Sequence, residues 1–386
     1  MSSHSDHPTS DHPTSDHPTS DHPTSDCPAL TALGWDREVA QALAEAVPPV
    51  GHGSGLLPGR VVRVERGACV VALDDGDHSA RTPVVPAVGD WVGVRRRGTD
   101  LSVETIARRR SQLARRDPEG LTQVLATNLD VVLITAPADR LSAARVERET
   151  AAAWDSGAQP LVLVTKVDLA PDGLVDDLRA RLIGVDVVET SALTGEGTEN
   201  VAAALRPCRT AVLLGPSGAG KSTLANALLR REQPGAERPG TEQPATEWLA
   251  TSDVRAGDRR GRHTTTSRHL LVLPGGGVLI DTPGLRSLSL AGGDGLARTF
   301  ADIEALAHGC RFADCRHEQE PGCAVAAAAD AGDLDVRRVS NYHKLQRELD
   351  FETRRDDPVA RGEIRRKHKI QSKMIKRFNQ DRGQRR

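Results

Sequence analysis

The segment GPSGAGKST, Gly215 to Thr223, constrains the fold of this chain more than any other feature. It fits the pattern G-x-x-x-x-G-K-[ST], follows the apolar run AVLL and precedes the helical pattern STLANALL. Glycines at this spacing let backbone N–H groups surround a phosphate at a helix N-terminus. The segment therefore predicts a nucleoside-phosphate site between a strand and a helix.

Buried-type strands on both sides of this segment indicate an α/β domain. The apolar runs LDVVLITA, PLVLVTKVD, VDVVETSA, TAVLLGPSG and GVLIDTPG alternate with helical stretches such as RVERETAAAWDSGA and GLVDDLRARL. This alternation is typical of a mostly parallel sheet with helices on both faces. We expect the domain to span residues 117–299.

The motif TKVD, residues 165–168, indicates which base is bound. It ends a buried strand, where ligands bind in open α/β sheets, and the Asp168 carboxylate can accept two hydrogen bonds from guanine. Adenine would leave that carboxylate unpaired, at a cost of roughly 1–3 kcal/mol. TSALTGEG, residues 190–197, follows the next strand and matches a loop that supports the guanine carbonyl. Guanine is favoured, although Thr165 replaces the usual asparagine and should weaken the tether to neighbouring loops.

The remaining motifs predict how the phosphates and Mg²⁺ are held. Lys221 should reach the β- and γ-phosphates and Ser222 should ligate Mg²⁺. Asp281 in VLIDTPG should hold Mg²⁺ through water, with the Gly284 N–H at the γ-phosphate. In RGRHTTTSRH the residues Thr264, Thr265 and Thr266 all remain candidates for the Mg²⁺ shell, and Thr265 is our working choice. The predicted nucleotide site consists of Thr165, Lys166, Val167, Asp168, Ser191, Ala192, Gly215, Pro216, Ser217, Gly218, Ala219, Gly220, Lys221, Ser222, Thr223, Asp281 and Gly284.

These motifs run in the order base reader, base support, phosphate loop, switch threonine and magnesium aspartate, which is a circular permutation of the usual GTPase order. A permuted chain can build the same sheet, because site residues need spatial rather than sequential neighbours. The sequence therefore predicts a circularly permuted α/β P-loop GTPase domain. The segment after DTPG runs directly toward a Cys/His cluster, so a rearrangement that depends on the γ-phosphate could act on a downstream domain.

The segments before the GTPase domain have different sequence patterns. Residues 5–24 are four copies of SDHPT, and we expect residues 1–26 to be a disordered tail because the repeat has nothing to bury. Residues 27–57 should hold a linker with an amphipathic helix from Leu33 to Val47. Short alternating runs with Gly/Asp turns predict a small β-barrel over residues 58–116.

A Cys/His cluster, CRFADCRHEQEPGC, predicts a structural zinc site in a helical domain over residues 300–353. Three thiolates and one imidazole make a closed tetrahedral Zn²⁺ site with no position left for water. Other cysteines are read as structural or incidental, and His308 remains a nearby alternative ligand outside the pattern. The predicted ligands are Cys310, Cys315, His317 and Cys323.

Charge predicts contact with RNA. The tail, residues 354–386, holds 13 Lys/Arg against 4 Asp/Glu, although the formal net charge of the chain is −2. Several basic patches beside a barrel favour an RNA surface held by phosphate contacts. Apolar runs are of strand length and the N-terminus is hydrophilic, so we expect a cytoplasmic, monomeric protein without a membrane span. The other basic patches are Arg95 to Arg97, Arg108 to Arg110 with Arg115 and Arg116, and Arg255, Arg259, Arg260 and Arg262.

The permuted motifs, the barrel before them and the Cys/His cluster behind them resemble the RsgA family of small ribosomal subunit biogenesis GTPases, over roughly residues 58–345. The resemblance implies an OB-fold, a permuted GTPase domain and a zinc domain that act late in assembly of the bacterial small subunit, which stimulates GTP hydrolysis. Leu285 stands where many GTPases carry the glutamine that orients water, so intrinsic hydrolysis should be slow. His263 is a candidate to orient that water, beside Lys221 and Thr265 in the catalytic set.

Two other functions fit parts of the pattern. An RNA-docking zinc protein that uses GTP only as a lock would show negligible turnover with subunits present. A P-loop ATPase or kinase would let ATP compete with GTP, and TKVD argues against it. The sequence favours the GTP hydrolase.

Overall fold

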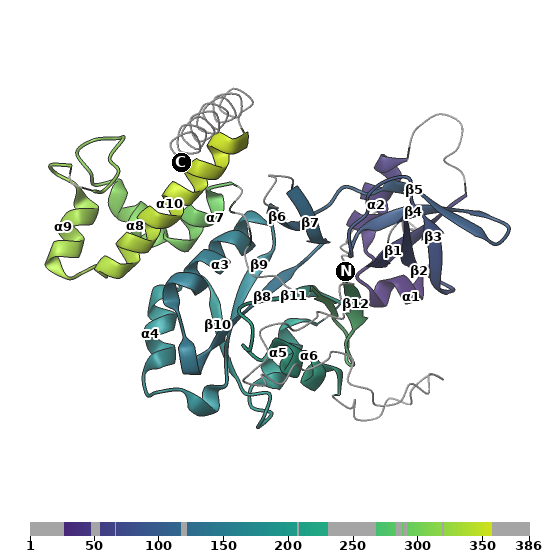
Figure 1. The fold of residues 1–386 in the computed structure, drawn as a ribbon, viewed down its shortest axis with the longest axis horizontal. Coiled ribbons are helices and arrows are strands. Elements are labelled where there is room, and N and C mark those ends of the chain that lie inside the picture. Colours follow the sequence, from purple (N-terminus) through teal and green to yellow (C-terminus); the bar gives the residue numbers. More distant parts are fainter. Residues whose placement is uncertain are drawn as a thin grey trace, which may run out of the picture.

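The computed structural model describes residues 27–47, 55–65, 67–116, 122–206, 208–230, 268–282, 288, 290, 292–318 and 320–356. In these ranges the chain forms a barrel, a central sheet domain and a cluster of C-terminal helices (Figure 1). The helices are α1 (Pro28–Ala32), α2 (Arg37–Ala46), α3 (Ala143–Asp155), α4 (Leu174–Arg181), α5 (Thr198–Ala204), α6 (Lys221–Leu229), α7 (Asp294–Thr299), α8 (Ala301–Ala307), α9 (Ala324–Ala331) and α10 (Val336–Asp356), with 3-10 turns η2 (Ala138–Arg140) and η3 (Val167–Leu169). The strands are β1 (Leu56–Val64), β2 (Ala68–Leu73), β3 (Gly76–Arg81), β4 (Trp91–Arg97), β5 (Asp100–Ile106), β6 (Gln112–Arg116), β7 (Thr122–Thr127), β8 (Val131–Pro137), β9 (Gln159–Thr165), β10 (Asp186–Thr190), β11 (Thr210–Leu214), β12 (His269–Val272) and β13 (Val278–Asp281).

The helix expected from Leu33 to Val47 begins later than predicted. Gly34 adopts a φ of 89°, which turns the chain, and Asp36 then caps α2 by accepting a hydrogen bond from the Val39 N–H at 2.8 Å. A capping aspartate fixes a helix start more strongly than an apolar pattern does. The first part of the expected helix is therefore a turn.

The N-terminal barrel has five strands. β1 pairs with β2 and with β4, and β3 and β5 complete the ring. Its interior is apolar, with Val61, Val71 and Val103 fully buried. The strands span residues 56–106. The segment to residue 116, which the sequence assigned to the barrel, instead supplies β6, which leaves the ring to pair with β7.

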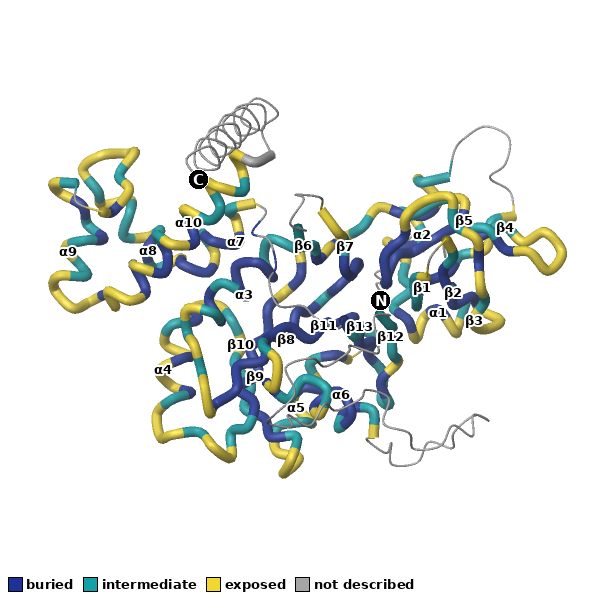
Figure 2. Tube along the Cα trace, in the orientation of Figure 1, coloured by how far each residue is buried: buried dark blue, intermediate teal, exposed yellow. Residues whose placement is uncertain are grey.

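The central sheet runs β10-β9-β8-β11-β13-β12. All neighbours are parallel except β12 and β13, which are antiparallel. The central strands β8, β9 and β11 are buried on both faces (Figure 2), as near-continuous apolar runs require, whereas the edge strand β10 and strand β12 are only partly buried. Alternate residues of each strand face opposite cores: Val132 packs in the core that includes α3 and α4, and Leu133 in the core that includes α5 and α6. The predicted doubly covered sheet is confirmed.

One buried guanidinium joins the barrel to the sheet. Arg60 of β1 is 1% exposed and donates to the Leu33 carbonyl, to the carbonyls of Gly89 and Asn128, and to Thr210 Oγ1 at 2.9 Å. Burial lowers the pKa of Arg60 to about 10, so it remains charged at neutral pH. Three parts of the chain therefore share one buried cation.

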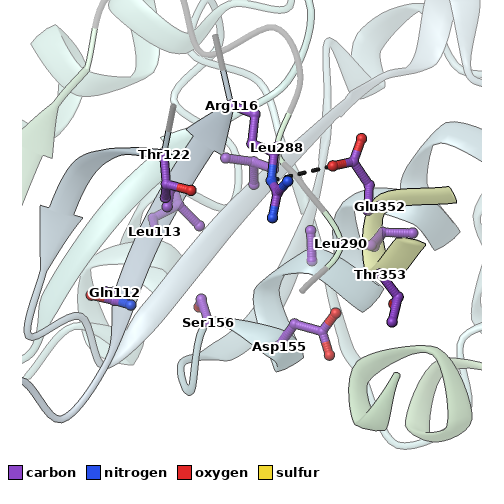
Figure 3. A pocket seen from close by; sticks show the side chains of 12 residues that line it. Gln112, Leu113, Arg116, Thr122, Asp155, Ser156, Leu288, Leu290, Glu352 and Thr353 are labelled. Carbon is purple, nitrogen blue, oxygen red and sulfur yellow. Dashed lines mark ion pairs between the residues drawn. The ribbon is translucent and has the colours of Figure 1, made fainter. Parts of the chain in front are cut away.

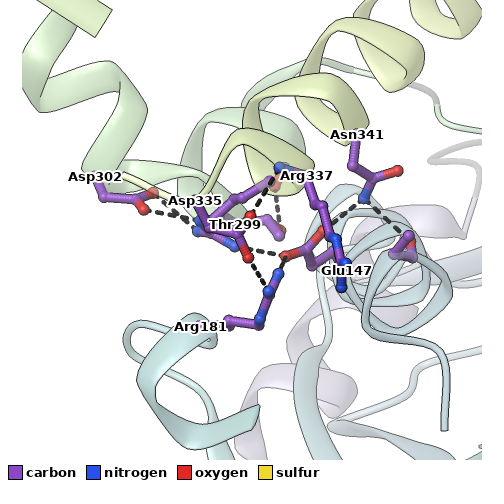
Figure 4. Close-up of polar contacts among 10 residues, drawn as sticks. Glu147, Arg181, Thr299, Asp302, Asp335, Arg337 and Asn341 are labelled. Atoms are coloured by element: carbon purple, nitrogen blue, oxygen red, sulfur yellow. Dashed lines mark hydrogen bonds and ion pairs between the residues drawn. The ribbon is translucent and has the colours of Figure 1, made fainter. Parts of the chain in front are cut away.

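A buried ionic network holds the C-terminal helices against α3 (Figure 4). Arg338 of α10 donates to Glu147 of α3 at 2.8 Å and to both oxygens of Asp302 at 2.8 Å. Asn341 donates to the other Glu147 oxygen at 2.6 Å. Glu147 and Arg338 are 1% and 2% exposed, so neither charge has water as an alternative partner. The network fixes how the helices sit on the sheet domain.

Replacing Arg338 with methionine should lower the free energy of unfolding by about 3–5 kcal/mol, because it removes the nearest cation from the buried Glu147 carboxylate and leaves it with Asn341 at 2.6 Å and Arg181 at 3.9 Å. Urea unfolding measures the loss. The matched control is Arg337→Ala, one residue earlier and exposed, which should change stability by about 0.5 kcal/mol or less. Equal effects of the two variants would contradict this account of the network.

A second contact joins α10 to the segment that follows β13. Arg148 of α3 donates to the Leu288 carbonyl at 2.7 Å and pairs with Glu348 of α10. Nearby, Arg116 of β6 lies 3.2 Å from Glu352, beside a cavity of about 160 Å³ that Leu288 and Leu290 help to line (Figure 3). Leu288 therefore contacts the sheet domain, and together with Leu290 it lines a cavity that the last helix also lines.

None of the helices within the described ranges is long and apolar enough to cross a membrane.

Candidate nucleotide-binding site

The predicted nucleotide motifs meet at one edge of the sheet. β8, β9, β10 and β11 are parallel neighbours, so their carboxyl ends open on the same side. Thr190 pairs with Thr165, and Thr165 with Pro137, across adjacent strands. Ligands of open α/β sheets bind at such an edge.

The phosphate loop has the tight backbone that its glycines permit. Gly215 follows β11 with a φ of 141°, and a Cβ there would lie 2.1 Å from Thr135 Oγ1. Thr135 itself donates to the Leu214 carbonyl at 2.9 Å and so supports the loop from β8. Lys221, the first residue of α6, donates from Nζ to the carbonyls of Gly215 and Pro216 at 2.8 and 2.7 Å. The ammonium group is therefore held inside the curve of the loop.

Thr165 ties the base-reading loop directly to the phosphate loop. Its side chain is buried and Oγ1 donates to the Ala219 carbonyl at 2.8 Å. The hydroxyl thus provides a tether that the sequence led us to expect would be weakened without the amide. This hydrogen bond joins the motif predicted to read the base to the loop predicted to bind the phosphates, although the two residues are 54 positions apart in the chain.

Replacing Thr165 with valine should weaken GTP binding about 3- to 10-fold, because the Ala219 carbonyl loses the buried Thr165 hydroxyl as a hydrogen-bond donor. Equilibrium titration with a fluorescent GTP analogue measures the change. Thr165→Ser, which keeps the hydroxyl, should bind within about 2-fold of wild type. Equal affinity of the valine and wild-type chains would show that the tether does not support binding.

The base-reading loop leaves its carboxylate accessible. Lys166 adopts a left-handed conformation with a φ of 57°, which turns the chain into η3. Lys166 Nζ pairs with Asp139 of η2 at 2.8 Å, and this hydrogen bond holds the pKa of the Asp139 carboxyl below its usual range. Asp168 is exposed and makes no hydrogen bond with any described residue. Its two oxygens are available to a ligand.

The loop after β10 is compact. The Ser191 N–H donates to the Glu196 carbonyl at 3.0 Å, and Gly197 approaches Glu189 so closely that a Cβ would lie 1.8 Å from its carbonyl oxygen. Only glycine fits there. Ser191 and Ala192 therefore stand beside the base-reading loop, at the end of the neighbouring strand.

Asp281 ends β13, which neighbours β11 in the sheet. Burial raises the pKa of its carboxyl, while the positive charges of His269 and Lys221 oppose that rise. A half-buried carboxylate close to the phosphate-loop lysine suits a Mg²⁺ ligand that acts through water. Ser222 lies next to Lys221 at the start of α6.

Several predicted residues lie outside the described part of the chain. These are His263, Thr264, Thr265, Thr266, Gly284 and Leu285, the arginines between residues 255 and 262, the SDHPT repeats and most of the basic tail.

The four predicted zinc ligands come together in the C-terminal helical cluster. Their ligand atoms all lie within 4.8 Å of one another. The Sγ atoms of Cys310 and Cys323 are 3.9 Å apart, and each lies 3.5 Å from His317 Nδ1. A tetrahedral Zn²⁺ with bonds of about 2.3 Å to sulfur and about 2.0 Å to nitrogen requires S–S and S–N separations of about 3.8 and 3.5 Å. The residues therefore fit zinc in both chemistry and spacing.

Local backbone groups also favour thiolates in this cluster. Burial opposes ionisation of the Cys310 thiol, but the backbone N–H groups of Ala324 and Val325, at the start of α9, donate to it and lower its pKa. Cys323 caps the same helix, since its Sγ accepts from the Ala326 N–H at 3.3 Å. The N-terminus of α9 thus stabilises negative charge where the cluster needs it.

Many arginines of the expected RNA surface are paired within the chain. Arg95 pairs with Glu104 at 2.7 Å, and Arg109 with Asp90 at 2.7 Å. Arg96, Arg110 and Arg116 are likewise paired, with Asp75, Asp36 and Glu352. Arg97 and Arg108 are exposed and have no such partner among the described residues. The basic patches therefore have fewer unpaired positive charges available to RNA phosphates than the sequence indicates.

The sequence motifs missed the turn η2 and Thr135. Thr135 lies in β8 and η2 follows that strand, and neither matches a nucleotide motif. The sequence did contain a usable indication. LDVVLITAP has the pattern of a buried parallel strand, so its carboxyl end is expected at the same edge of the sheet as the carboxyl ends of the strands that carry the motifs.

Comparisons with known proteins agree with this arrangement. The model of the RsgA GTPase family matches residues 106–291. A curated relative from Streptomyces coelicolor, named small ribosomal subunit biogenesis GTPase RsgA, is 47% identical over 88% of this chain and 92% of its own length. A relative of the same name from Streptomyces avermitilis is 45% identical over 87% of this chain and 90% of its own length.

Solved structures share the fold. YjeQ from Thermotoga maritima is similar with a TM-score of 0.55 and 22% identity, over 76% of this chain and 98% of its own. YloQ, described as a circularly permuted GTPase, gives 0.54 and 22%, over 78% of this chain and 98% of its own. The sheet domain has this circularly permuted GTPase fold, with the base-reading strand β9 ahead of the phosphate-loop strand β11. With the sequence identity of its relatives, these findings show that the chain belongs to the RsgA GTPase family.

Proposed function

We propose that this chain is a GTP hydrolase that acts in biogenesis of the small ribosomal subunit. The hydrogen bond from Thr165 to the Ala219 carbonyl is the observation that carries the proposal, because it brings a guanine-reading motif and a phosphate loop into one site. Family membership and the names of the relatives support both the activity and the setting. Action on ribosomal subunits implies a cytoplasmic protein.

In this proposal each motif contacts one part of the nucleotide. Asp168 accepts hydrogen bonds from the guanine ring, and the backbone of Ser191 and Ala192 supports the guanine carbonyl. The N–H groups from Gly215 to Thr223 surround the phosphates. Lys221 exchanges the carbonyls of its own loop for β- and γ-phosphate oxygens.

Ser222, Thr265 and Asp281 are the residues that we expect to hold Mg²⁺, which neutralises phosphate charge when it is bound. Gly284 should donate to the γ-phosphate and His263 should orient the attacking water. Intrinsic hydrolysis is slow in this scheme, because Leu285 cannot orient water, and contact with the subunit completes the site. Hydrolysis then favours release from the subunit.

The other domains supply contacts with the subunit. We infer that the barrel is an OB-fold, because its strands close in the order β1-β2-β3-β5-β4 and back to β1. Arg97 and Arg108, which have no acidic partner among the described residues, are its best candidates for RNA phosphates. Cys310, Cys315, His317 and Cys323 would hold one structural Zn²⁺, which fixes the loop between α8 and α9.

The decisive experiment measures GTP hydrolysis by the full chain with and without purified small subunits, at two salt concentrations. We expect little turnover alone and marked stimulation by subunits, reduced at high salt because phosphate contacts weaken. Excess ATP should not compete. Binding without stimulated turnover would favour the docking protein that uses GTP as a lock, and ATP competition would favour an ATPase.

A further inference from the structure

The turn η2 contacts both halves of the nucleotide site. Asp139 pairs with Lys166 of the base-reading loop at 2.8 Å. Its neighbour Arg140 donates from Nη2 to the Ser217 carbonyl of the phosphate loop at 2.6 Å. Two consecutive residues thus bridge loops that come from different strands.

The position of η2 follows from the order of the strands. β8 lies between β9, which ends in the base-reading loop, and β11, which ends in the phosphate loop. A guanine nucleotide that spans these loops has its ribose and α-phosphate between them. The turn that ends β8 therefore lies beside this middle part of the nucleotide.

Arg140 lies against the phosphate loop and keeps N–H donors that the loop does not use. Its guanidinium packs against the phosphate loop, since a Cβ on Gly218 would lie 2.7 Å from Nη2. The side chain is 50% exposed, and Nη1 has no hydrogen-bond partner in the described ranges. Asp139 makes its close contact with Lys166, and its distance to Arg140 Nε is 3.9 Å. Positive charge therefore remains accessible at the rim of the phosphate loop.

We propose that Arg140 binds the α-phosphate of the guanine nucleotide and so slows its dissociation. A planar guanidinium suits phosphate oxygens because it offers several N–H donors in a fixed fork. The α-phosphate is present in both GDP and GTP, so the contact acts on both. This inference rests on the proposed guanine nucleotide site, and it assigns to η2, the turn that follows β8, a part of nucleotide binding outside the five sequence motifs.

The test measures dissociation of a fluorescent GDP from the full chain by chasing with unlabelled GDP. Arg140→Ala should release GDP about 10- to 100-fold faster, as expected for loss of a hydrogen bond to a charged group. Arg206→Ala is the matched control, since Arg206 is similarly exposed at 46% and its ion-pair partner among the described residues is Glu199 on α5.

Two further variants separate phosphate binding from mere support of the loop. Arg140→Gln keeps a donor for the Ser217 carbonyl but has no charge, whereas Arg140→Lys keeps the charge. We expect glutamine to release GDP as fast as alanine and lysine to restore most of the retention. Restoration by glutamine, or GDP release from Arg140→Ala within about 2-fold of wild type, would overturn the proposal. Failure of the wild-type chain to bind GDP would instead count against the guanine nucleotide site itself.

Discussion

A chain with Lys221→Ala should hydrolyse GTP about 10²- to 10³-fold more slowly than wild type when small subunits are present, as expected for loss of one charged donor at a reacting phosphate. The structure gives the reason. Lys221 Nζ lies inside the curve of the phosphate loop, where the carbonyls of Gly215 and Pro216 hold it at 2.8 and 2.7 Å. Alanine leaves those carbonyls without their donor and the phosphates without a compensating charge.

Single-turnover hydrolysis with radiolabelled GTP and purified subunits measures this loss, and circular dichroism checks that the variant is folded. Lys344→Ala, an exposed lysine on α10, is the control and should leave turnover unchanged. Our assignment of the phosphate site fails if the Lys221 variant keeps more than about a tenth of wild-type turnover.

Removal of zinc should unfold the loop from Cys310 to Cys323 and the start of α9. Free energies of about 10–16 kcal/mol for structural Zn²⁺ in small domains exceed what so short a polar segment can gain by packing. The segment offers few alternatives, since Phe312 is 42% exposed and contributes little to a core. Cys323→Ser should have the same effect, because it removes one of the four zinc ligands while serine can still cap α9.

Metal analysis of the purified chain should give one zinc per chain, and hydrogen exchange across α9 should accelerate after chelation or in the Cys323 variant. Cys208→Ser, a cysteine outside the cluster, should retain the metal and normal exchange. A chain that lacks zinc as purified and protects α9 all the same would refute the structural metal.

The sequence predicted the central sheet well because its middle strands, β8, β9 and β11, are buried on both faces. Runs such as LVLV and AVLL have few alternatives to a covered parallel strand, and β9 and β11 lie where those runs stand. The end of the barrel was less predictable. Alternation continues through Gln112–Arg116, so nothing local shows that this strand pairs with β7 instead of the barrel.

The nucleotide motifs were recognisable because phosphate and base contacts need particular residues at fixed spacing. The contacts of Thr165, Asp139 and Arg140 were not, because they depend on which strands are neighbours in space. For the arginines of the basic patches, the sequence overestimated the available charge. Their positive charge is plain in the sequence, but the acids that neutralise Arg95 and Arg109 come from other strands and turns.

The buried guanidinium of Arg60 has a consequence for evolution of the chain. Its hydrogen bonds end in the segment before α2, in the barrel, and at Thr210 of the sheet domain, so these parts should open as one cooperative unit in native-state exchange. If the barrel were exchanged for that of an unrelated protein, the buried Leu33 carbonyl and Thr210 hydroxyl would lose their hydrogen-bond partner at the boundary between the barrel and the sheet domain. A replacement barrel is therefore compatible with this sheet domain only if it places an arginine at the position of Arg60.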